Sequence, residues 1–185
     1  MKIAVYGGSF NPPHIAHAMV ASWLVWSGKV DQVLIVPVYQ HAFEKIHGKR
    51  LISYETRVLW CRLMAETLGP SYKVSEVESR LPTPSYSIDT LRALQSEHPQ
   101  HQFRLVVGAD VVSQLPQWKE WAEIERLFTP IIVGRVGYDG HRSPMVFPDV
   151  SSTAIREAVR NRHIPTQWLL RSVADHIQNH PTVFD

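Results

Sequence analysis

The chain has a single cysteine, Cys61, among its 185 residues. This excludes an internal disulfide and a zinc site built from cysteine thiolates, and it fits a reducing compartment such as the cytoplasm. No stretch reaches the ~18 apolar residues of a membrane-spanning helix. The apolar run after Lys2 is too short for the hydrophobic region of a signal peptide. We therefore expect Met1 to begin a soluble, cytoplasmic protein with no membrane partner.

A large charge of either sign is also missing. The sequence has 19 Lys and Arg against 17 Asp and Glu, which gives a formal net charge of +2. Nucleic-acid binders usually carry a clear basic excess or a stripe of Lys and Arg, so we expect no nucleic-acid partner. A small anionic ligand needs only a few local donors and stays compatible with this composition.

Short apolar runs that alternate with segments of helical length predict an α/β protein. Near-continuous apolar runs are typical of buried parallel strands. We expect strands at 2–6, 32–36, 72–77, 103–107 and 131–133, and helices at 16–26, 54–68, 88–96, 118–128, 151–160 and 166–179. This order predicts one Rossmann-like domain over residues 1–185, a doubly wound parallel sheet with helices on both faces. Such sheets bind ligands beyond the carboxyl ends of their strands.

Several local features refine this prediction. Ser53 and Ser87 are expected to cap the helices that follow them. Residues 38–52 mix aromatic, basic and histidine side chains without periodicity, which indicates a functional loop. Three tryptophans follow apolar helix faces and are expected to pack in the core; these are Trp23, Trp26 and Trp168.

The first functional motif, residues 7–17, reads GGSFNPPHIAH. Two glycines at a strand end let the backbone approach a ligand, and the helix that follows offers free N–H groups to an anion. His14 and His17 are three residues apart and can share a helix face, where two imidazoles can stabilise charge on a phosphoryl group. The alternative is a plain glycine turn followed by solvated histidines, which the convergence of the parts disfavours.

The second motif, residues 151–156, reads SSTAIR. Hydroxyl side chains before a helical pattern make a capped N-terminus, and Arg156 lies about one turn into the helix. Backbone amides, hydroxyls and a guanidinium suit a polyphosphate. Taken alone, the segment is more often an ordinary helix cap with a surface arginine, so its value depends on the first motif.

Together these motifs resemble the two signatures of the nucleotidyltransferases, a glycine turn with His-x-Gly-His and Ser-Ser-Thr-x-Ile-Arg. Three further segments resemble those of the bacterial nicotinate-nucleotide adenylyltransferases: PSYSIDTL at 84–91, GAD at 108–110 followed by Trp118, and VGRVGY at 133–138. The chain departs from the pattern at Ala16 and Asn11, and most strongly at residues 40–45, QHAFEK, where the family often has Pro-Pro-His-Lys.

The resemblance implies that the phosphate of nicotinate mononucleotide attacks the α-phosphorus of ATP, giving deamido-NAD and pyrophosphate. A phosphate monoester has a second pKa of about 6, so the nucleophile is mostly dianionic at neutral pH and needs no general base. Such transfers rely on positioning and charge stabilisation. Mg²⁺ is expected with ATP, bound through phosphates and water rather than by protein side chains.

The same resemblance assigns the catalytic roles to His14, His17 and Arg156. His17 is expected to contact the α-phosphoryl group, while Gly108 and Asp110 meet the ribose of ATP. The expected ATP-binding residues are Gly7, Gly8, Ser9, Phe10, His14, His17, Gly108, Asp110, Ser151, Ser152, Thr153 and Arg156.

The mononucleotide is expected to bind Lys45, Tyr86, Ser87, Trp118 and Arg135. Trp118 either stacks on the pyridine ring or packs within the predicted helix 118–128. Tyr86 and Ser87 belong to the segment that resembles the nicotinate-carboxylate site, although Tyr86 can equally be a packed loop aromatic. Lys45 and Arg135 either contact the mononucleotide phosphate or lie solvated on the surface.

Two other functions stay open at this point. One is a related adenylyltransferase that uses nicotinamide mononucleotide or another phosphomonoester such as pantetheine phosphate. The other is a non-catalytic nucleotide-binding sensor, which would not need His14, His17 and Arg156 as transition-state donors. The sequence leaves the oligomeric state undecided, a homo-oligomer included.

Overall fold

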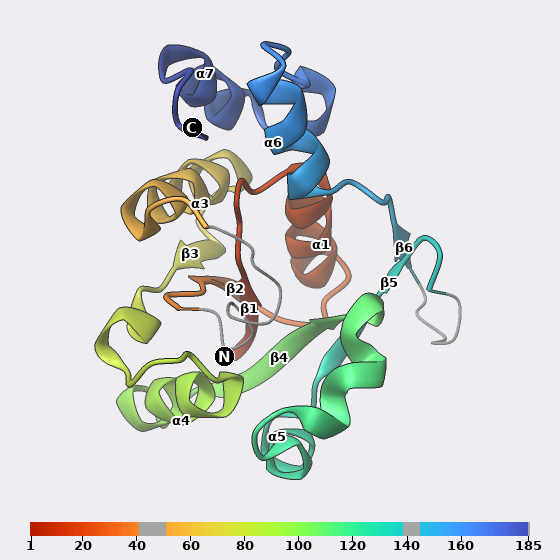
Figure 1. Cartoon of the computed structure of the whole chain (residues 1–185). Coiled ribbons are helices and arrows are strands. Elements are labelled where there is room, and N and C mark those ends of the chain that lie inside the picture. The colour runs from red at the N-terminus through yellow and green to blue at the C-terminus, as the bar shows by residue number, and fades with distance from the viewer. Residues whose placement is uncertain (41–50, 139–144, 185) are drawn as a thin grey trace.

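A parallel β-sheet forms the centre of the protein in the computed structural model, which describes residues 1–40, 51–138 and 145–184. The described part of this sheet has six strands in the order β3-β2-β1-β4-β5-β6, and all neighbouring strands are parallel (Figure 1). Their bounds are Lys2–Gly8 for β1, Gln32–Pro37 for β2, Tyr72–Val74 for β3, Gln102–Gly108 for β4, Ile131–Arg135 for β5 and Val146–Phe147 for β6.

Helices cover both faces of the sheet, which confirms the predicted Rossmann-like α/β fold (Figure 1). One face carries α1 (Ile15–Trp26), α3 (Tyr54–Leu68), α6 (Ser152–Arg160) and α7 (Arg171–Asn179). The other carries α4 (Ser87–Glu97) and α5 (Trp121–Phe128). Three 3₁₀ helices complete the described chain: η1 (Val77–Arg80), η2 (Ala109–Gln117) and η3 (Thr166–Trp168). None of the helices that the structure describes is long and apolar enough to span a membrane.

Two apolar clusters hold these layers together. The first includes Leu24, Ile35, Trp60, Ile155 and Ile177, and the second includes Ile88, Leu91, Phe103, Ile124 and Phe128. Burying one large aliphatic or aromatic side chain stabilises the fold by about 1.5–3 kcal/mol. The clusters therefore fix the helices on both faces of the sheet. Strands β2 and β3 extend the sheet on one side of β1 and strands β4 to β6 on the other, so the winding direction reverses between β1 and β4.

Helix α3 has the bounds that the sequence predicts. The Ser53 hydroxyl accepts a hydrogen bond from the backbone N–H of Thr56 at 3.2 Å, which satisfies one free amide of the first turn. At the other end Gly69 adopts φ of 106°, a conformation that glycine reaches without strain. The prediction that Ser87 caps α4 is wrong, because Tyr86 occupies the cap position and Ser87 is the first helical residue.

Other boundaries differ from the predictions for identifiable reasons. The helix predicted at 118–128 begins only at Trp121, because Trp118 is extended after η2 and Glu120 adopts a left-handed φ of 53°. The helix predicted at 166–179 is divided into η3 and α7, since Leu169 between them is extended. The strand predicted at 72–77 ends at Val74, and the two-residue edge strand β6 was not predicted.

The three tryptophans assigned to the core do not behave alike. Trp23 and Trp168 pack partly buried against the first cluster, as predicted. For Trp26 the prediction is wrong, since its side chain is 80% exposed. Helix α1 is apolar around most of its circumference, so periodicity alone could not identify the face that meets the sheet.

This difference within α1 can be measured as stability. We expect Leu24→Ala to lower the free energy of unfolding by about 2–5 kcal/mol, because Leu24 is fully buried and its removal leaves a cavity. Trp26→Ala is the matched control on the same helix and should change stability by less than about 0.5 kcal/mol. Urea denaturation monitored by circular dichroism would measure both. A large loss in Trp26→Ala would show that its side chain packs against something in solution.

Candidate active site

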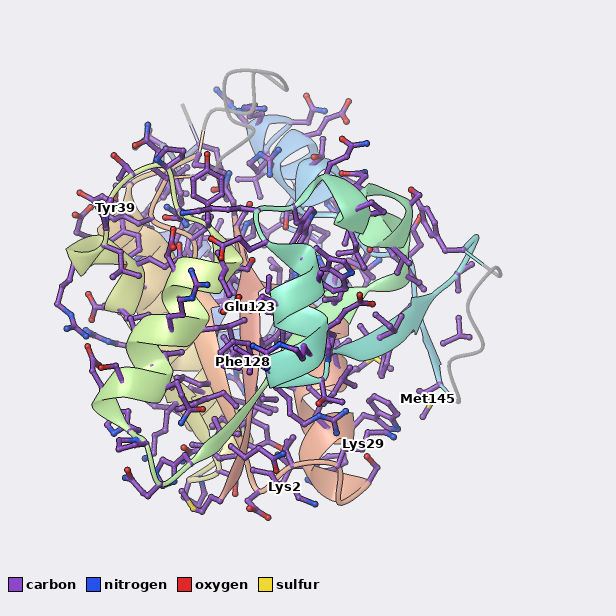
Figure 2. All side chains as sticks on the ribbon, turned by 90° about the horizontal axis from the view of Figure 1, so that it is seen from below. Lys2, Lys29, Tyr39, Glu123, Phe128 and Met145 are labelled. Atoms are coloured by element: carbon purple, nitrogen blue, oxygen red, sulfur yellow. The ribbon has the colours of Figure 1, made fainter. Side chains whose placement is uncertain are left out.

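A cavity of about 840 Å³ opens at the carboxyl ends of the central strands. Its walls include Gly7 and Gly8 from the end of β1, Gly108 from the end of β4, and Arg135 from the end of β5. In Figure 2, Tyr39, just after β2, lies at the opposite end of the sheet from Lys2, where β1 begins. The cavity therefore occupies the position where open parallel sheets bind ligands.

The turn after β1 is built around the buried ring of Phe10. A Cβ at Gly8 would lie 3.1 Å from Cζ of this ring, so a glycine lets the turn pack closely. The ring centroid of Phe10 lies 5.0 Å from that of His17 and 5.6 Å from that of Tyr6. Because Phe10 is only 1% exposed and does not line the cavity, its ring supports the histidine, and its contact with ATP stays a prediction.

His14 and His17 are held together at the start of α1. The backbone N–H of His14 donates to Nδ1 of His17 at 3.1 Å, and the backbone N–H of His17 donates to the carbonyl of His14 at 2.9 Å. Their ring centroids are 3.8 Å apart. An imidazole nitrogen that accepts a hydrogen bond carries no proton, so the neutral form of His17 has its proton on Nε2. Nε2 is thus the donor that His17 can offer a ligand.

The surroundings of both histidines favour the neutral imidazole. Burial lowers the pKa of His14 to about 4, with a further lowering by Arg135 and an opposing effect of Asp149. Burial, then His14 and Arg135, lower the pKa of His17 well below its usual range. Burial followed by the charge of Asp110 raises the pKa of Tyr6 on the cavity wall, so its hydroxyl stays protonated.

The second motif contacts the first across about 140 residues of sequence. A guanidinium N–H of Arg156 donates to the carbonyl of Asn11 at 2.7 Å, and the Ser152 hydroxyl donates to the carbonyl of Pro12 at 2.8 Å. Ser151 caps α6 by accepting from the backbone N–H of Ala154 at 3.1 Å. The structure therefore brings the two motifs together. None of residues 151–156 lines the cavity directly, and Val150 is the wall residue beside them.

Arg135, on the cavity wall, joins two carboxylates, of which Asp110 also lines the cavity. It lies 2.7 Å from an oxygen of Asp110 after β4 and 2.7 Å from an oxygen of Asp149 before α6. A Cβ at Gly108 would collide with the Asp110 carboxylate, so this glycine leaves space for the acid. Arg135 lies in the cavity rather than solvated outside it, and both carboxylates neutralise part of its charge.

The far end of the cavity contains the segment before α4 and the residues after η2. Ser85, Tyr86, Ser87, Trp118 and Lys119 line it. Stacking of Trp118 on the pyridine ring stays a prediction. The half-buried residue lines the cavity and packs edge to face with Trp121, with ring centroids 6.1 Å apart. It does so from an extended residue and not from within a helix. Lys45 lies outside the described residues.

Sequence reasoning missed two buried charged residues beside the cavity. The Arg57 guanidinium, 1% exposed, donates to the carbonyls of Ser9 at 3.0 Å, Val38 at 2.8 Å and Ile52 at 3.2 Å. Arginine within a helix normally indicates an exposed position, so no local pattern identifies this tie between α3 and the turn after β1.

Glu78 is the second missed residue. Its carboxylate is buried on the cavity wall and accepts from the backbone N–H of Tyr39 at 3.0 Å and from the Thr90 hydroxyl at 2.9 Å. It thereby links the end of β2 to the first turns of α4. Within residues 1–40, 51–138 and 145–184, no three His, Cys, Asp or Glu side chains gather in a way that would hold a metal ion.

Comparison with known proteins identifies the family. Residues 5–158 match the model of the cytidylyltransferase-like family. A protein of Anaeromyxobacter sp. strain K, named probable nicotinate-nucleotide adenylyltransferase, is 38% identical over 84% of this chain and 82% of its own length. The Bacillus subtilis nicotinate-nucleotide adenylyltransferase is 32% identical over 91% of this chain and 90% of its own. This chain belongs to the nicotinate-nucleotide adenylyltransferases.

A solved structure shares the fold of this adenylyltransferase at greater sequence distance. The nicotinic acid mononucleotide adenylyltransferase of Plasmodium falciparum, solved with NaAD, superimposes with a TM-score of 0.78. The comparison covers 100% of this chain and 98% of the other at 18% identity. This likeness shows the shared fold. The family model and the relatives at 32–38% identity confirm the family that the motifs resemble, and the protein is a nucleotidyltransferase.

The neutral histidines predict a pH dependence of stability. Because the pKa values of His14 and His17 are lowered in the folded state, the unfolded chain binds more protons between about pH 4 and pH 6.5. The free energy of unfolding should therefore fall as the pH drops through this window. Replacing either residue by Asn should reduce the slope by up to about 1.4 kcal/mol per pH unit.

Urea titrations at half-unit pH steps would measure these slopes. His163→Asn, at an exposed position, is the matched control and should leave the slope unchanged. Equal slopes for the unsubstituted protein and the His14→Asn and His17→Asn variants would contradict the neutral, buried state of the pair.

Proposed function

We propose that this chain transfers the adenylyl group of ATP to nicotinate mononucleotide in the cytoplasm. An oxygen of the mononucleotide phosphate forms a bond to the α-phosphorus of ATP, the bond from that phosphorus to the bridging oxygen breaks, and pyrophosphate leaves with the electron pair. The observation that carries the proposal is the contact of the two nucleotidyltransferase motifs, through Arg156 and Ser152, next to a cavity lined by His14 and His17.

His17 is the donor that we assign to the α-phosphoryl group. Its Nε2–H is preorganised, because Nδ1 is occupied by the backbone N–H of His14 and the ring is supported by Phe10. Negative charge that builds up on the phosphoryl oxygens favours hydrogen bonds from such fixed donors. We assign His14, which lies beside His17, to the triphosphate. The buried Nδ1 of His14 lacks a hydrogen-bond partner among the described residues.

The ATP-binding residues divide between two helix starts. Gly7, Gly8, Ser9 and the Phe10 backbone form the turn before α1, whose free N–H groups favour phosphate oxygens. Ser151, Ser152, Thr153 and Arg156 form the start of α6 and are assigned to the β- and γ-phosphates and the departing pyrophosphate. Arg156 already bonds both Thr153 and the Asn11 carbonyl, so it lies between these two helix starts.

Asp110 is assigned to the ribose of ATP, since its carboxylate lies over Gly108 at the end of β4. Arg135 holds that carboxylate in place and is also assigned to the mononucleotide phosphate. At the far end, Trp118 is assigned to the pyridine ring, with Tyr86 and Ser87 beside its carboxylate. Lys45 keeps its assignment to the mononucleotide phosphate on the resemblance alone.

Magnesium enters this reaction as part of the substrate, the magnesium complex of ATP. Mg²⁺ prefers octahedral oxygen coordination and keeps several of its waters, so phosphate oxygens and water can supply its ligands. Asp110, the acid on the wall at the end of β4, is paired with Arg135, so we assign no metal ligand to it.

An assay of pyrophosphate and dinucleotide formation tests the proposed reaction. ATP is supplied with nicotinate mononucleotide, nicotinamide mononucleotide or pantetheine phosphate in turn. We expect the highest kcat/KM with nicotinate mononucleotide. A preference for one of the other two acceptors would move the protein to a related adenylyltransferase activity. Binding of ATP without pyrophosphate release from any acceptor would favour the sensor.

The role of His17 makes a quantitative prediction. His17→Ala should lower kcat by about 100–1,000-fold, or about 2.7–4 kcal/mol, because one preorganised donor to the transition state is lost. The KM for ATP should change much less, and circular dichroism would check that the variant is folded. His163→Ala serves as the exposed control. A folded His17→Ala variant with near-normal kcat would remove His17 from the mechanism.

A further inference from the structure

We propose that Lys119 determines the preference of this enzyme for a mononucleotide whose pyridine ring carries a carboxylate over one that carries a neutral amide. The inference rests on the proposed function and deepens it, because it names a specificity-determining side chain in the same cavity. Its basis is the difference between the two positively charged side chains of the described wall, Arg135 and Lys119, in how many carboxylates bind them.

Lys119 is a wall residue in the part of the cavity assigned to the pyridine ring, and its ammonium group bonds Asp89 in the hollow that adjoins this part of the cavity. Lys119 directly follows Trp118, and both residues line the cavity together with Tyr86. Nζ of Lys119 lies 4.9 Å from the centroid of the Tyr86 ring. The flexible four-carbon side chain allows the ammonium to turn from this hollow toward a substituent of a ring stacked on Trp118.

Lys119 differs from the other full charges on the described wall. Arg135 is bound by two carboxylates and lies at the end of β5. Glu78 and Asp110 are anions, so they cannot attract a carboxylate. Lys119 has one carboxylate partner, Asp89, at 2.8 and 3.1 Å from its two oxygens, and Asp89 is not part of the cavity wall. An ammonium has three donors, so Lys119 can hold Asp89 and still bind a substrate carboxylate.

Helix α4 adds to the positive potential at this place. Its first residue, Ser87, lines the cavity, and no side chain caps the helix at Tyr86. Free amides at a helix start favour an anion, but they also bond the carbonyl oxygen of a neutral amide. A full positive charge separates the two substituents more strongly, because it acts on the net charge and not only on the acceptor oxygen.

The side chain of Lys119 is positively charged at physiological pH. The hydrogen bond with Asp89 is the main cause that raises the pKa of Lys119 above its usual value. The side chain is 42% exposed, so water screens its attraction for a substrate carboxylate. The expected effect is therefore moderate in size, and it should decrease at high salt.

The test compares kcat/KM for nicotinate mononucleotide with that for nicotinamide mononucleotide. In Lys119→Met the ratio of the two should fall roughly two- to fivefold, through a loss with the acid and little change with the amide. Lys119→Arg keeps the charge and should retain most of the ratio. Lys29→Met, a lysine at the other end of the sheet (Figure 2), is the remote control and should leave the ratio unchanged.

A second variant separates the charge of Lys119 from its structural role. Asp89→Asn breaks the same ion pair but leaves the ammonium in place, so the ratio should stay at or above that of the unsubstituted enzyme. If Asp89→Asn lowers the ratio as much as Lys119→Met, the ion pair merely supports the loop and the inference is overturned. An unchanged ratio in Lys119→Met overturns it as well.

Failure of the proposed function would give other kinetic results than failure of the role of Lys119. If the unsubstituted protein forms no dinucleotide from either mononucleotide, the proposed function is wrong. If it forms the dinucleotide and Trp118→Ala raises the KM for acid and amide equally, the pyridine ring lies where the inference needs it. A Trp118→Ala variant with both KM values unchanged would place the ring elsewhere and overturn the role of Lys119 alone.

Discussion

The carbonyl groups of Asn11 and Pro12 are the point on which the site depends. They accept hydrogen bonds from Arg156 and Ser152, and so join the start of α1 to the start of α6. A hydrogen bond to a charged donor contributes about 1.5–3 kcal/mol, which is enough to hold two loops in one arrangement. With both helix starts fixed, backbone amides and hydroxyls from the two ends of the chain can serve one polyphosphate. Arg57 anchors the same turn from the opposite side, through the carbonyl of Ser9.

The histidine pair shows why a neutral donor suits this chemistry. Two charged imidazoles 3.8 Å apart would repel each other, and burial adds to the cost of either charge. The pair therefore starts neutral, with the proton of His17 directed to Nε2 by the His14 amide. When an anionic triphosphate approaches, it favours the protonated form, so charge can be added where the transition state needs it. The nucleophile is already a dianion, which explains why the proposed mechanism uses donors and needs no carboxylate to remove a proton.

Fold and site were predictable from the sequence to different extents. Strands β1, β2 and β4 are buried on both faces and therefore form unbroken apolar runs, while Ser53 and Gly69 mark both ends of α3. The motifs also identified the residues of the two helix starts. The burial of Arg57 depends on carbonyls from three separate segments, and no local pattern encodes such a contact. The left-handed turn at Glu120 was missed because an apolar residue every three or four positions continues from Trp118 into α5.

The two cations on the described part of the cavity wall, Arg135 and Lys119, are restrained to different degrees, and this difference matches the proposed roles. Arg135 pairs with a carboxylate on each side, so its charge mainly holds Asp110 and the segment before α6 in place. Lys119 has one partner, on a helix start that itself favours an anion. A planar guanidinium bound twice is suited to fixing geometry, whereas a flexible ammonium bound once can turn toward a ligand. In the proposed roles, the rigid positive group is assigned to the phosphates and the adaptable one to the ring, a separation that would let one cavity orient ATP while it discriminates between mononucleotides.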